Sequence, residues 1–183
     1  SQSETFVIGS LGDSISTGFN AKSWGNNLDS SWSTGGSESI ESHLIRLRKL
    51  IDSNIDAYNY AEPGAKIKDL SEQVTSVLSK NPHYLTILIG VNDICDWGDE
   101  YEENLMEVKE IFVAEIEKII SELNDIKITI VALPNLYNLW EVGSSSTNCR
   151  MRWRLFGVCK PLLGKKVTKR GRLNFFTKFT HSP

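Results

Sequence analysis

The chain has 183 residues and a net charge of −3, with 40% hydrophobic and 23% charged residues. This composition is that of an ordinary globular domain and excludes a mainly disordered, collagen-like or coiled-coil protein. No apolar run reaches the ~18–20 residues that a membrane-spanning helix needs. The chain opens with no charged leader followed by an apolar stretch, so we expect a signal peptide to have been removed or never to have existed.

The charges are divided unevenly along the chain. Residues 144–183 contain ten lysine and arginine residues and no acidic one, whereas residues 1–143 hold all 23 acidic residues. We therefore expect an α/β domain over residues 1–143 and a basic C-terminal segment over residues 144–183. That segment could bind an acidic partner, dock on the acidic domain, or be a truncated or divergent end of the same domain.

Short apolar runs that end at turn signals alternate with stretches in which apolar residues recur at helical spacing. In chain order these predict a strand at 5–10, a helix at 40–51, a strand at 57–61, a helix at 67–78, a strand at 84–89, a helix at 105–123 and a strand at 128–133. The stretch from Asn20 to Ser37 is rich in Ser, Gly, Asn and Trp and predicts a long loop. After Leu133 the periodicity fades, and no fifth strand is predicted.

The alternation predicts an α/β fold, specifically a three-layer α/β/α sandwich with a parallel sheet of the flavodoxin-like kind. Each predicted helix is long enough to serve as the crossover between parallel neighbours. The strand at 84–89 is apolar on both faces, as expected for a sheet that helices cover on both sides.

Three turns follow directly on predicted strands, and in an open parallel sheet such turns share the edge where ligands bind. They are Gly12-Asp13-Ser14, Pro63-Gly64-Ala65 and Gly90-Val91-Asn92-Asp93. Ser14 is a candidate nucleophile at the predicted start of a helix, where N–H groups favour negative charge. Backbone donors at Ser14 and Gly64, with the Asn92 amide, would form an oxyanion hole. Each turn alone is also typical of an ordinary turn, and the combination is what indicates catalysis.

These turns resemble the sequence blocks of the GDSL, or SGNH, hydrolases. Gly12-Asp13-Ser14-Ile15-Ser16 resembles the first block, Gly64 the second-block glycine, and Gly90 to Asp93 the G-x-N-D block. Further segments resemble the phospholipase B-like branch, namely 31–36, 59–66, 92–95 and 132–137. The resemblance covers roughly Phe6 to Val142. It implies hydrolysis of carboxylic esters, often acyl esters of phospholipids or lysophospholipids, by a serine acyl-enzyme route without a metal or other cofactor.

The resemblance also implies a general base from a late D-x-x-H motif, and the sequence has no such motif. His43 falls in a predicted helix and is expected to be solvated, and His83 precedes a strand at the opposite edge of the sheet. His181 lies in about the right place, but Lys178 stands three residues before it. Either the chain ends before that block or the protein is a variant without the Asp–His pair. Both cases predict feeble or absent turnover, because a serine hydroxyl needs a base.

The remaining features give open alternatives. The spacing of Cys149 and Cys159 suggests a disulfide, and two free thiols are the alternative. Four tryptophans in predicted loops either line an acyl-chain cleft or fill the core, namely Trp24, Trp32, Trp97 and Trp140. No H-E-x-x-H, P-loop or G-x-G-x-x-G motif is present, so neither a metal nor a nucleotide cofactor is predicted.

The expected partner is a small-molecule or lipid ester. The basic segment 144–183 adds an anionic membrane surface as a further candidate partner, whereas nucleic acid is not favoured because residues 1–143 are acidic. The habit of the resembling family implies a secreted, secretory-pathway or lysosomal location. A non-catalytic binder of acyl ligands on the same scaffold is the alternative function.

Overall fold

The computed structural model describes residues 5–51, 54–97, 101–155, 159 and 163. The chain forms two compact units, Ser1–Gly90 with Glu107–Ala132, and Val91–Met106 with Leu133–Pro183. Each unit is described by itself below. The boundary expected at residue 143 stays a prediction.

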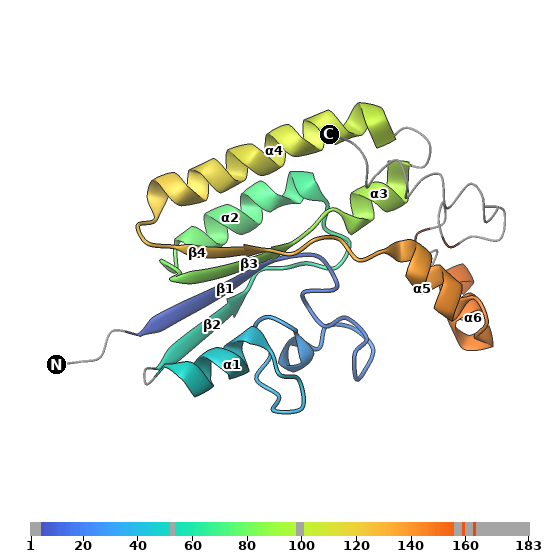
Figure 1. Ribbon diagram of the computed structural model, residues 1–183, viewed down its shortest axis with the longest axis horizontal. Helices are drawn as coiled ribbons and strands as arrows, with labels where there is room; N and C mark the ends of the chain where they lie inside the picture. The colour runs from blue at the N-terminus through green and yellow to red at the C-terminus, as the bar shows by residue number, and fades with distance from the viewer. Residues whose placement is uncertain (1–4, 52–53, 98–100, 156–158, 160–162, 164–183) are drawn as a thin grey trace. The chain divides into compact units, whose positions relative to one another are not determined.

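The first unit is built on a four-stranded parallel sheet of β1 (Phe6–Gly12), β2 (Ile55–Asn59), β3 (Tyr84–Leu88) and β4 (Lys127–Ile130). The strand order is β2-β1-β3-β4, which Figure 1 shows with β1 and β3 at the centre. All four predicted strands are present, with bounds shifted by at most three residues. The predicted α/β fold with a parallel sheet is confirmed.

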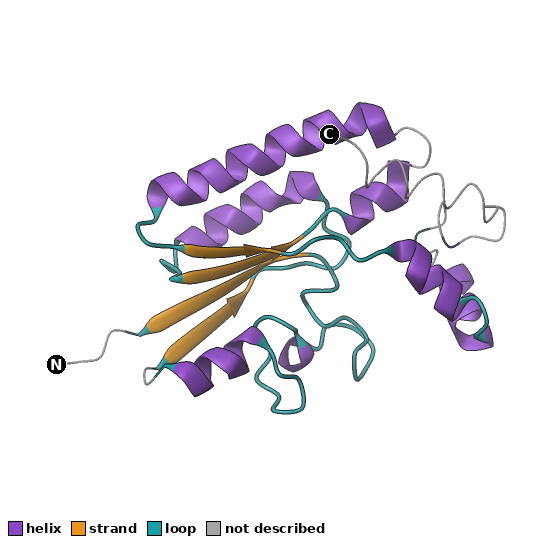
Figure 2. Ribbon diagram, in the orientation of Figure 1, coloured by secondary structure: helices purple, strands orange, loops and turns teal. Residues whose placement is uncertain are grey.

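Helices cover both faces of this sheet, which makes three layers (Figure 2). One face carries α2 (Leu70–Leu78) and α4 (Tyr101–Glu122), of which the residues from Glu107 on belong to the first unit. The other face carries α1 (His43–Leu50). Two short 3-10 helices, Leu28–Ser30 and Ile67–Asp69, lie in the connections.

Alternate strand side chains supply two cores, because successive residues of a strand point to opposite faces. The core on the α2 and α4 face includes Leu11, Leu70, Val74, Val77, Leu85, Ile87 and Ile119. The core on the α1 face is smaller and consists of Ile8, Leu44 and Ile55, with Phe6, Leu47, Ile51 and Tyr84 packed against it. Burying each large aliphatic side chain contributes about 1.5–3 kcal/mol to the stability of the fold. Leu11, the residue before the last of β1, belongs to the first core, which therefore holds the carboxyl end of β1 in place.

The second unit is helical in its described residues, with α3 (Val91–Trp97), the first turns of α4, α5 (Leu136–Gly143) and α6 (Thr147–Leu155). Its small core contains Ile94, Cys159 and Leu163, with Val91, Cys95, Leu133, Trp140 and Trp153 packed against it. Trp140 thus belongs to a helix and packs in a core, whereas the sequence placed it in a loop.

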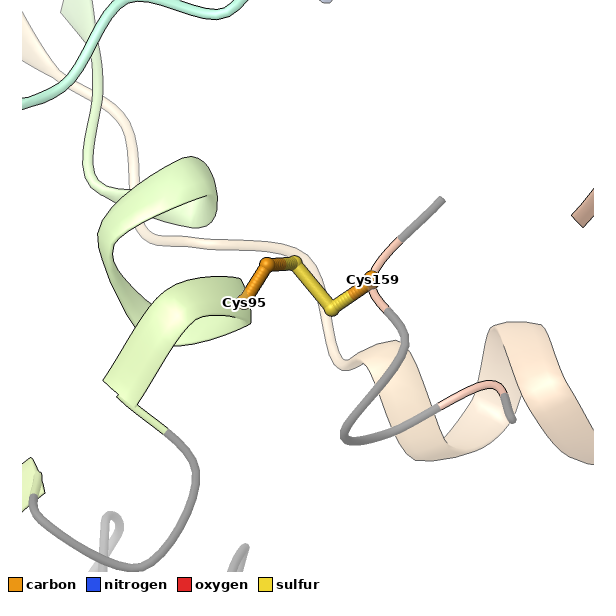
Figure 3. Close-up of a disulfide and its surroundings, with 2 residues drawn as sticks. All are labelled: Cys95 and Cys159. Atoms are coloured by element: carbon orange, nitrogen blue, oxygen red, sulfur yellow. A yellow bond between two sulfur atoms is a disulfide. The ribbon is translucent and has the colours of Figure 1, made fainter. Parts of the chain in front are cut away.

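A disulfide joins Cys95 of α3 to Cys159, with the two Cα atoms 4.6 Å apart (Figure 3). Cys149 in α6 is a free thiol. The predicted Cys149–Cys159 bridge is therefore wrong. The reason is tertiary, since Cys95 and Cys159 pack in one hydrophobic cluster although 64 residues separate them.

Among the helices of the described residues, none combines the length and the hydropathy that crossing a membrane requires.

Candidate active site

The strand β1 ends at Gly12, where the backbone takes a conformation that only glycine tolerates. Its φ is +147°, and a Cβ atom at this position would collide with the carbonyl oxygen of Leu88. The chain can therefore turn sharply out of the sheet directly before Asp13 and Ser14.

Ser14 is half-buried and lies in a run of consecutive turns, so the predicted helix start at this residue is wrong. The carbonyl of Asp13 accepts hydrogen bonds from the N–H groups of Ser16 and Thr17, at 3.0 and 3.3 Å. A positive φ of 63° at Gly18 then breaks the helical path after about one turn. Ser14 therefore lies in a single turn and not at the start of a long helix, so no long helix dipole acts on it.

Asp13 shapes this turn from its buried position. Its Oδ1 atom accepts a 2.9 Å hydrogen bond from the N–H of Ile15. A side-chain oxygen that bonds the backbone two residues on is typical of an Asx turn. This agrees with the turn-shaping role that the sequence suggested for Asp13, and it fixes the backbone on both sides of Ser14.

The turn that carries Gly64 is joined to the Ser14 turn. The N–H of Glu62 donates a 3.1 Å hydrogen bond to the carbonyl of Gly12, and the N–H of Ala65 bonds back to the carbonyl of Glu62. Gly64 has a φ of +85° and is exposed, with no atom within 4 Å of where a Cβ would lie. The structure therefore brings these two predicted turns together at the carboxyl edge of the sheet.

Asn92 is the second residue of α3 and belongs to the second unit. It follows β3 in the chain after only three residues, Ile89 to Val91. Its side chain is half-buried.

Polar side chains that were not predicted as site residues support the Ser14 turn through hydrogen bonds. The carbonyl of Ser16 accepts hydrogen bonds from Ser31 Oγ at 2.7 Å and from Asn59 Nδ2 at 2.9 Å. The hydroxyls of Ser33 and Thr86 are 2.6 Å apart, and both residues are fully buried. The Ser-rich loop predicted over residues 20–37 therefore serves as a hydrogen-bonded base for the turn.

Gln73 of α2, which supports the end of β1, was also missed by the sequence analysis. Its side-chain Oε1 accepts a 2.7 Å hydrogen bond from the N–H of Gly12, and its Nε2 donates one of 2.9 Å to the carbonyl of Gly12. The signal that could have found it is an amide on the apolar face of a helix, beside Leu70, Val74 and Val77.

His43 forms its side-chain contacts at the opposite end of the sheet from Ser14. Its Nδ1 lies 2.7 Å from the hydroxyl of Tyr84, and Trp32 packs edge-on against its ring at 5.3 Å. Burial lowers the pKa of His43 below the usual histidine value, and the charge of Arg46 lowers it further. The expectation of a solvated helix residue is therefore wrong, because aromatic rings distant in sequence cover it.

Strand register separates this histidine from Ser14. Tyr84 lies opposite Ile8, whereas Leu88 lies opposite Gly12. These two pairs are four residues apart, which is about 13 Å along a strand. His83 lies at the same far edge as expected, where its Nδ1 accepts a 3.0 Å hydrogen bond from the N–H of Val7. The third histidine, His181, lies outside the described residues.

Within the described part of the chain, no group of three or more His, Cys, Asp or Glu side chains is arranged to hold a metal ion.

Comparison with known proteins assigns the chain to a family. The sequence matches the GDSL-like lipase/acylhydrolase family model over residues 8–160. The chain belongs to this family. The GDSL-like family assignment agrees with the α/β scaffold described above. No curated protein sequence matches the chain.

Solved structures are similar to this GDSL-like chain at low sequence identity. A catalytic mutant of Axe2, an acetylxylan esterase from Geobacillus stearothermophilus, aligns with a TM-score of 0.51 and 14% identity, over 96% of this chain and 73% of that one. TesA aligns with a TM-score of 0.49 and 14% identity, over 84% and 72%. The acetyl xylan esterase AlAXEase aligns with a TM-score of 0.47 and 20% identity, over 68% and 57%. The chain thus spans between 57% and 73% of the length of these three proteins.

Proposed function

We propose that this protein acts on carboxylic esters through Ser14. The Ser14 hydroxyl oxygen attacks the ester carbonyl, and the alcohol leaves as the acyl group becomes bonded to Ser14. Water then attacks the acyl-enzyme, releasing the carboxylic acid and restoring the hydroxyl. The proposed reaction uses no metal or other cofactor.

The N–H groups of Ser14 and Gly64 are the proposed donors to the oxyanion that forms in each step. The observation that carries this proposal is the 3.1 Å bond from Glu62 to Gly12, because it ties the Gly64 turn to the Ser14 turn. The exposed Gly64 leaves space for a substrate carbonyl. The sequence pattern adds the Asn92 amide as the third proposed donor. Such donors contribute about 2.7–4 kcal/mol each when preorganised.

The surface that follows Ser14 favours an apolar acyl group. Ile15 and Phe19 are each 38% exposed, and Trp24 is 72% exposed. The rings of Phe19 and Trp24 contact each other, with centroids 6.3 Å apart. Exposed apolar side chains grouped beside a reactive residue are typical of a site for an apolar ligand. Together with the segments that resemble the phospholipase B-like branch, they support a lipid acyl ester, such as a phospholipid or lysophospholipid, as substrate.

Slow turnover is part of the proposal, because no D-x-x-H motif is present and both described histidines have structural partners. A missing imidazole can be supplied from solution. We therefore expect added imidazole to accelerate acylation of Ser14. Fast imidazole-independent hydrolysis that Ser14→Ala abolishes would show instead that the chain contains its own base, and His181→Ala would test that candidate.

The experiment that tests the function measures hydrolysis of p-nitrophenyl acetate, butyrate, octanoate and palmitate with and without imidazole. We expect Ser14-dependent release of nitrophenol, faster with imidazole and with the longer chains that the apolar surface can hold. Release that is the same for wild type and Ser14→Ala at every chain length would reject the proposal.

A non-catalytic acyl binder is the second candidate, and the exposed apolar side chains of Ile15, Phe19 and Trp24 favour it. Such a protein would bind a fatty acid or acyl ester on the Ile15–Trp24 surface without reacting at Ser14. Saturable binding of a fluorescent fatty acid, together with unmodified Ser14 after imidazole and ester, would support the binder over the hydrolase.

The basic C-terminal segment is proposed to contact an anionic membrane. In α6, Arg150, Arg152 and Arg154 accompany Met151 and Leu155, which are 52% and 69% exposed. Basic residues near an anionic bilayer contribute about 1 kcal/mol each. Co-sedimentation with phosphatidylserine vesicles that is lost at high salt, and in a chain lacking residues 144–183 provided that it folds, would support this. Equal binding to neutral vesicles would contradict it.

A secreted, secretory-pathway or lysosomal location is also proposed. The Cys95–Cys159 disulfide supports an oxidising compartment, since disulfides persist there and are rare in the cytosol. Localisation of the natural protein in the cytosol or nucleus would contradict this proposal.

A further inference from the structure

The ladder between β1 and β2 ends just before the turn that carries Ser14. The last pair in this ladder is Ser10 with Asn59, followed by a bond from the N–H of Tyr60 to the carbonyl of Ser10. The backbone N–H and carbonyl groups of Gly12 point toward β2, as those of Ser10 do, because residues two apart in a strand share their hydrogen-bonding direction. Its N–H group therefore needs an acceptor that β2 no longer supplies.

Gln73 supplies that acceptor from α2, 61 residues away in the chain. Its Oε1 accepts from the Gly12 N–H at 2.7 Å, while its Nε2 donates to the Gly12 carbonyl at 2.9 Å. The side chain is buried, with 5% of the residue exposed. A primary amide is suited to this place because it presents one acceptor and one donor side by side. Gln73 thus replaces a strand neighbour for the Gly12 N–H, and it shares the Gly12 carbonyl with the N–H of Glu62, which donates to it at 3.1 Å.

We infer that Gln73 is a positioning residue for Ser14, a role that rests on the proposed ester hydrolysis. The two bonds fix the peptide groups on both sides of Gly12, and the next peptide groups belong to Asp13 and Ser14. The direction of the Ser14 N–H and the place of its hydroxyl therefore depend on how Gly12 is held. Donors and nucleophiles contribute to catalysis only when they are aimed before the transition state forms.

Two substitutions separate this role from a general contribution to stability. Gln73→Leu removes both bonds. Gln73→Glu keeps the shape, but the ionised carboxylate has no donor for the Gly12 carbonyl, whereas the protonated carboxyl has both a donor and an acceptor. Burial beside a cavity of about 200 Å³ whose lining includes Glu62, Asp69 and Glu72 raises the pKa of the introduced carboxyl. Gln73→Glu is therefore expected to recover function as the pH falls.

The matched control is Val77→Ala on the same helix. Val77 is fully buried in the core and has no hydrogen bond to Gly12. Removing its two methyl groups lowers the melting temperature while leaving the Gly12–Gln73 bonds in place. It therefore shows what a loss of stability alone does to the reaction at Ser14.

The experiment measures phosphonylation of Ser14 by an alkyl fluorophosphonate with imidazole present, using mass spectrometry to obtain the maximal rate constant and the half-saturating probe concentration. We expect Gln73→Leu to lower the rate constant about tenfold or more at an unchanged half-saturating concentration. We expect the rate of Gln73→Glu, relative to wild type, to rise from pH 8 to pH 5.5. Val77→Ala is expected to keep the wild-type rate constant below its melting temperature.

The outcomes that overturn the inference are distinct from those that overturn the function. Wild-type rates in both Gln73 variants, or a Gln73→Glu defect that does not change with pH, would reject the positioning role while the hydrolase stands. A rate loss in Val77→Ala equal to that in Gln73→Leu would reduce Gln73 to a stabilising residue. Absence of Ser14 labelling in wild type would reject the proposed function and, with it, this role.

Discussion

The side-chain amide of Asn59 donates a 2.9 Å hydrogen bond to the carbonyl oxygen of Ser16. The same nitrogen lies 2.9 Å from Thr34 Oγ1, and the side-chain oxygen accepts from the N–H of Ala61 at 3.0 Å. One amide at the end of β2 therefore links the Ser14 turn, the Ser-rich loop and the start of the Gly64 turn.

Replacing Asn59 by Leu is expected to destabilise the protein by about 1–3 kcal/mol, because the N–H of Ala61 loses its acceptor and the carbonyl of Ser16 loses one of its two donors. Urea denaturation monitored by fluorescence measures this free energy of unfolding. Asp56→Asn is the control on the same strand, since Asp56 is exposed and an isolated surface change costs within about 0.5 kcal/mol. Equal midpoints for the two variants would contradict the linking role.

Alanine substitutions at Gly12 and Gly64 are expected to differ in how much they destabilise the protein. Gly12→Ala is expected to cost at least about 3 kcal/mol, since the added Cβ collides with the Leu88 carbonyl in addition to the backbone strain. Gly64→Ala is expected to cost only the strain of a positive φ, about 1–2 kcal/mol, because the space around it is open. Thermal unfolding of both variants measures which substitution lowers the melting temperature more. A larger decrease for Gly64→Ala than for Gly12→Ala would contradict the close approach of Gly12 to the Leu88 carbonyl.

The disulfide gives a prediction for stability and for thiol count. Replacing Cys95 and Cys159 together by Ser is expected to cost about 2–4 kcal/mol, because the bridge constrains a long loop of the unfolded chain. Titration of the unfolded, unreduced protein is expected to find one free thiol, that of Cys149. Cys149→Ser is the control and should leave the melting temperature nearly unchanged. Three titratable thiols, or a bridge that includes Cys149, would contradict the assignment.

Acid is expected to destabilise the first unit through His43. Burial lowers its pKa in the folded state, so the unfolded chain binds more protons once the pH falls below the ordinary histidine value of about 6.5. The free energy of unfolding should therefore fall as the pH drops through that value, and the fall should end below the folded pKa. Urea titrations from pH 8 to pH 5 of wild type and His43→Gln test this. A slope that the variant retains in full would exclude His43 as its source.

The sequence predicted the sheet well because strand signals in this chain are local. Each run of apolar residues, such as Tyr84 to Ile89, ends at a turn residue, and helical spacing fills the intervals. The start of α1 shows the limit of such patterns. Its apolar spacing begins at Ile40, but the helix begins at His43, because the Ser42 hydroxyl caps it by accepting from the N–H of Ile45.

The candidate site was predicted only in part, since its supports depend on tertiary contacts. The turns of Ser14 and Gly64 follow strands and could be found from sequence. By contrast, the helix expected at Ser14 is absent, because Gly18 and Asn20 have positive φ values and Asn20 forms hydrogen bonds with Gly25 of the following loop. Sequence spacing could not predict the disulfide partner of Cys159 or the aromatic rings that pack on His43 either, because each comes from a distant segment.

The most direct test of the account is to find which residue of the folded protein a fluorophosphonate modifies. Peptide mass spectrometry after reaction with imidazole present should find the added phosphonyl group on Ser14. Prior unfolding in urea, which separates the Ser14 and Gly64 turns, should abolish that modification. Modification of other serines to the same extent, or equal labelling of Ser14 in the folded and unfolded chain, would contradict a preorganised hydrolase site.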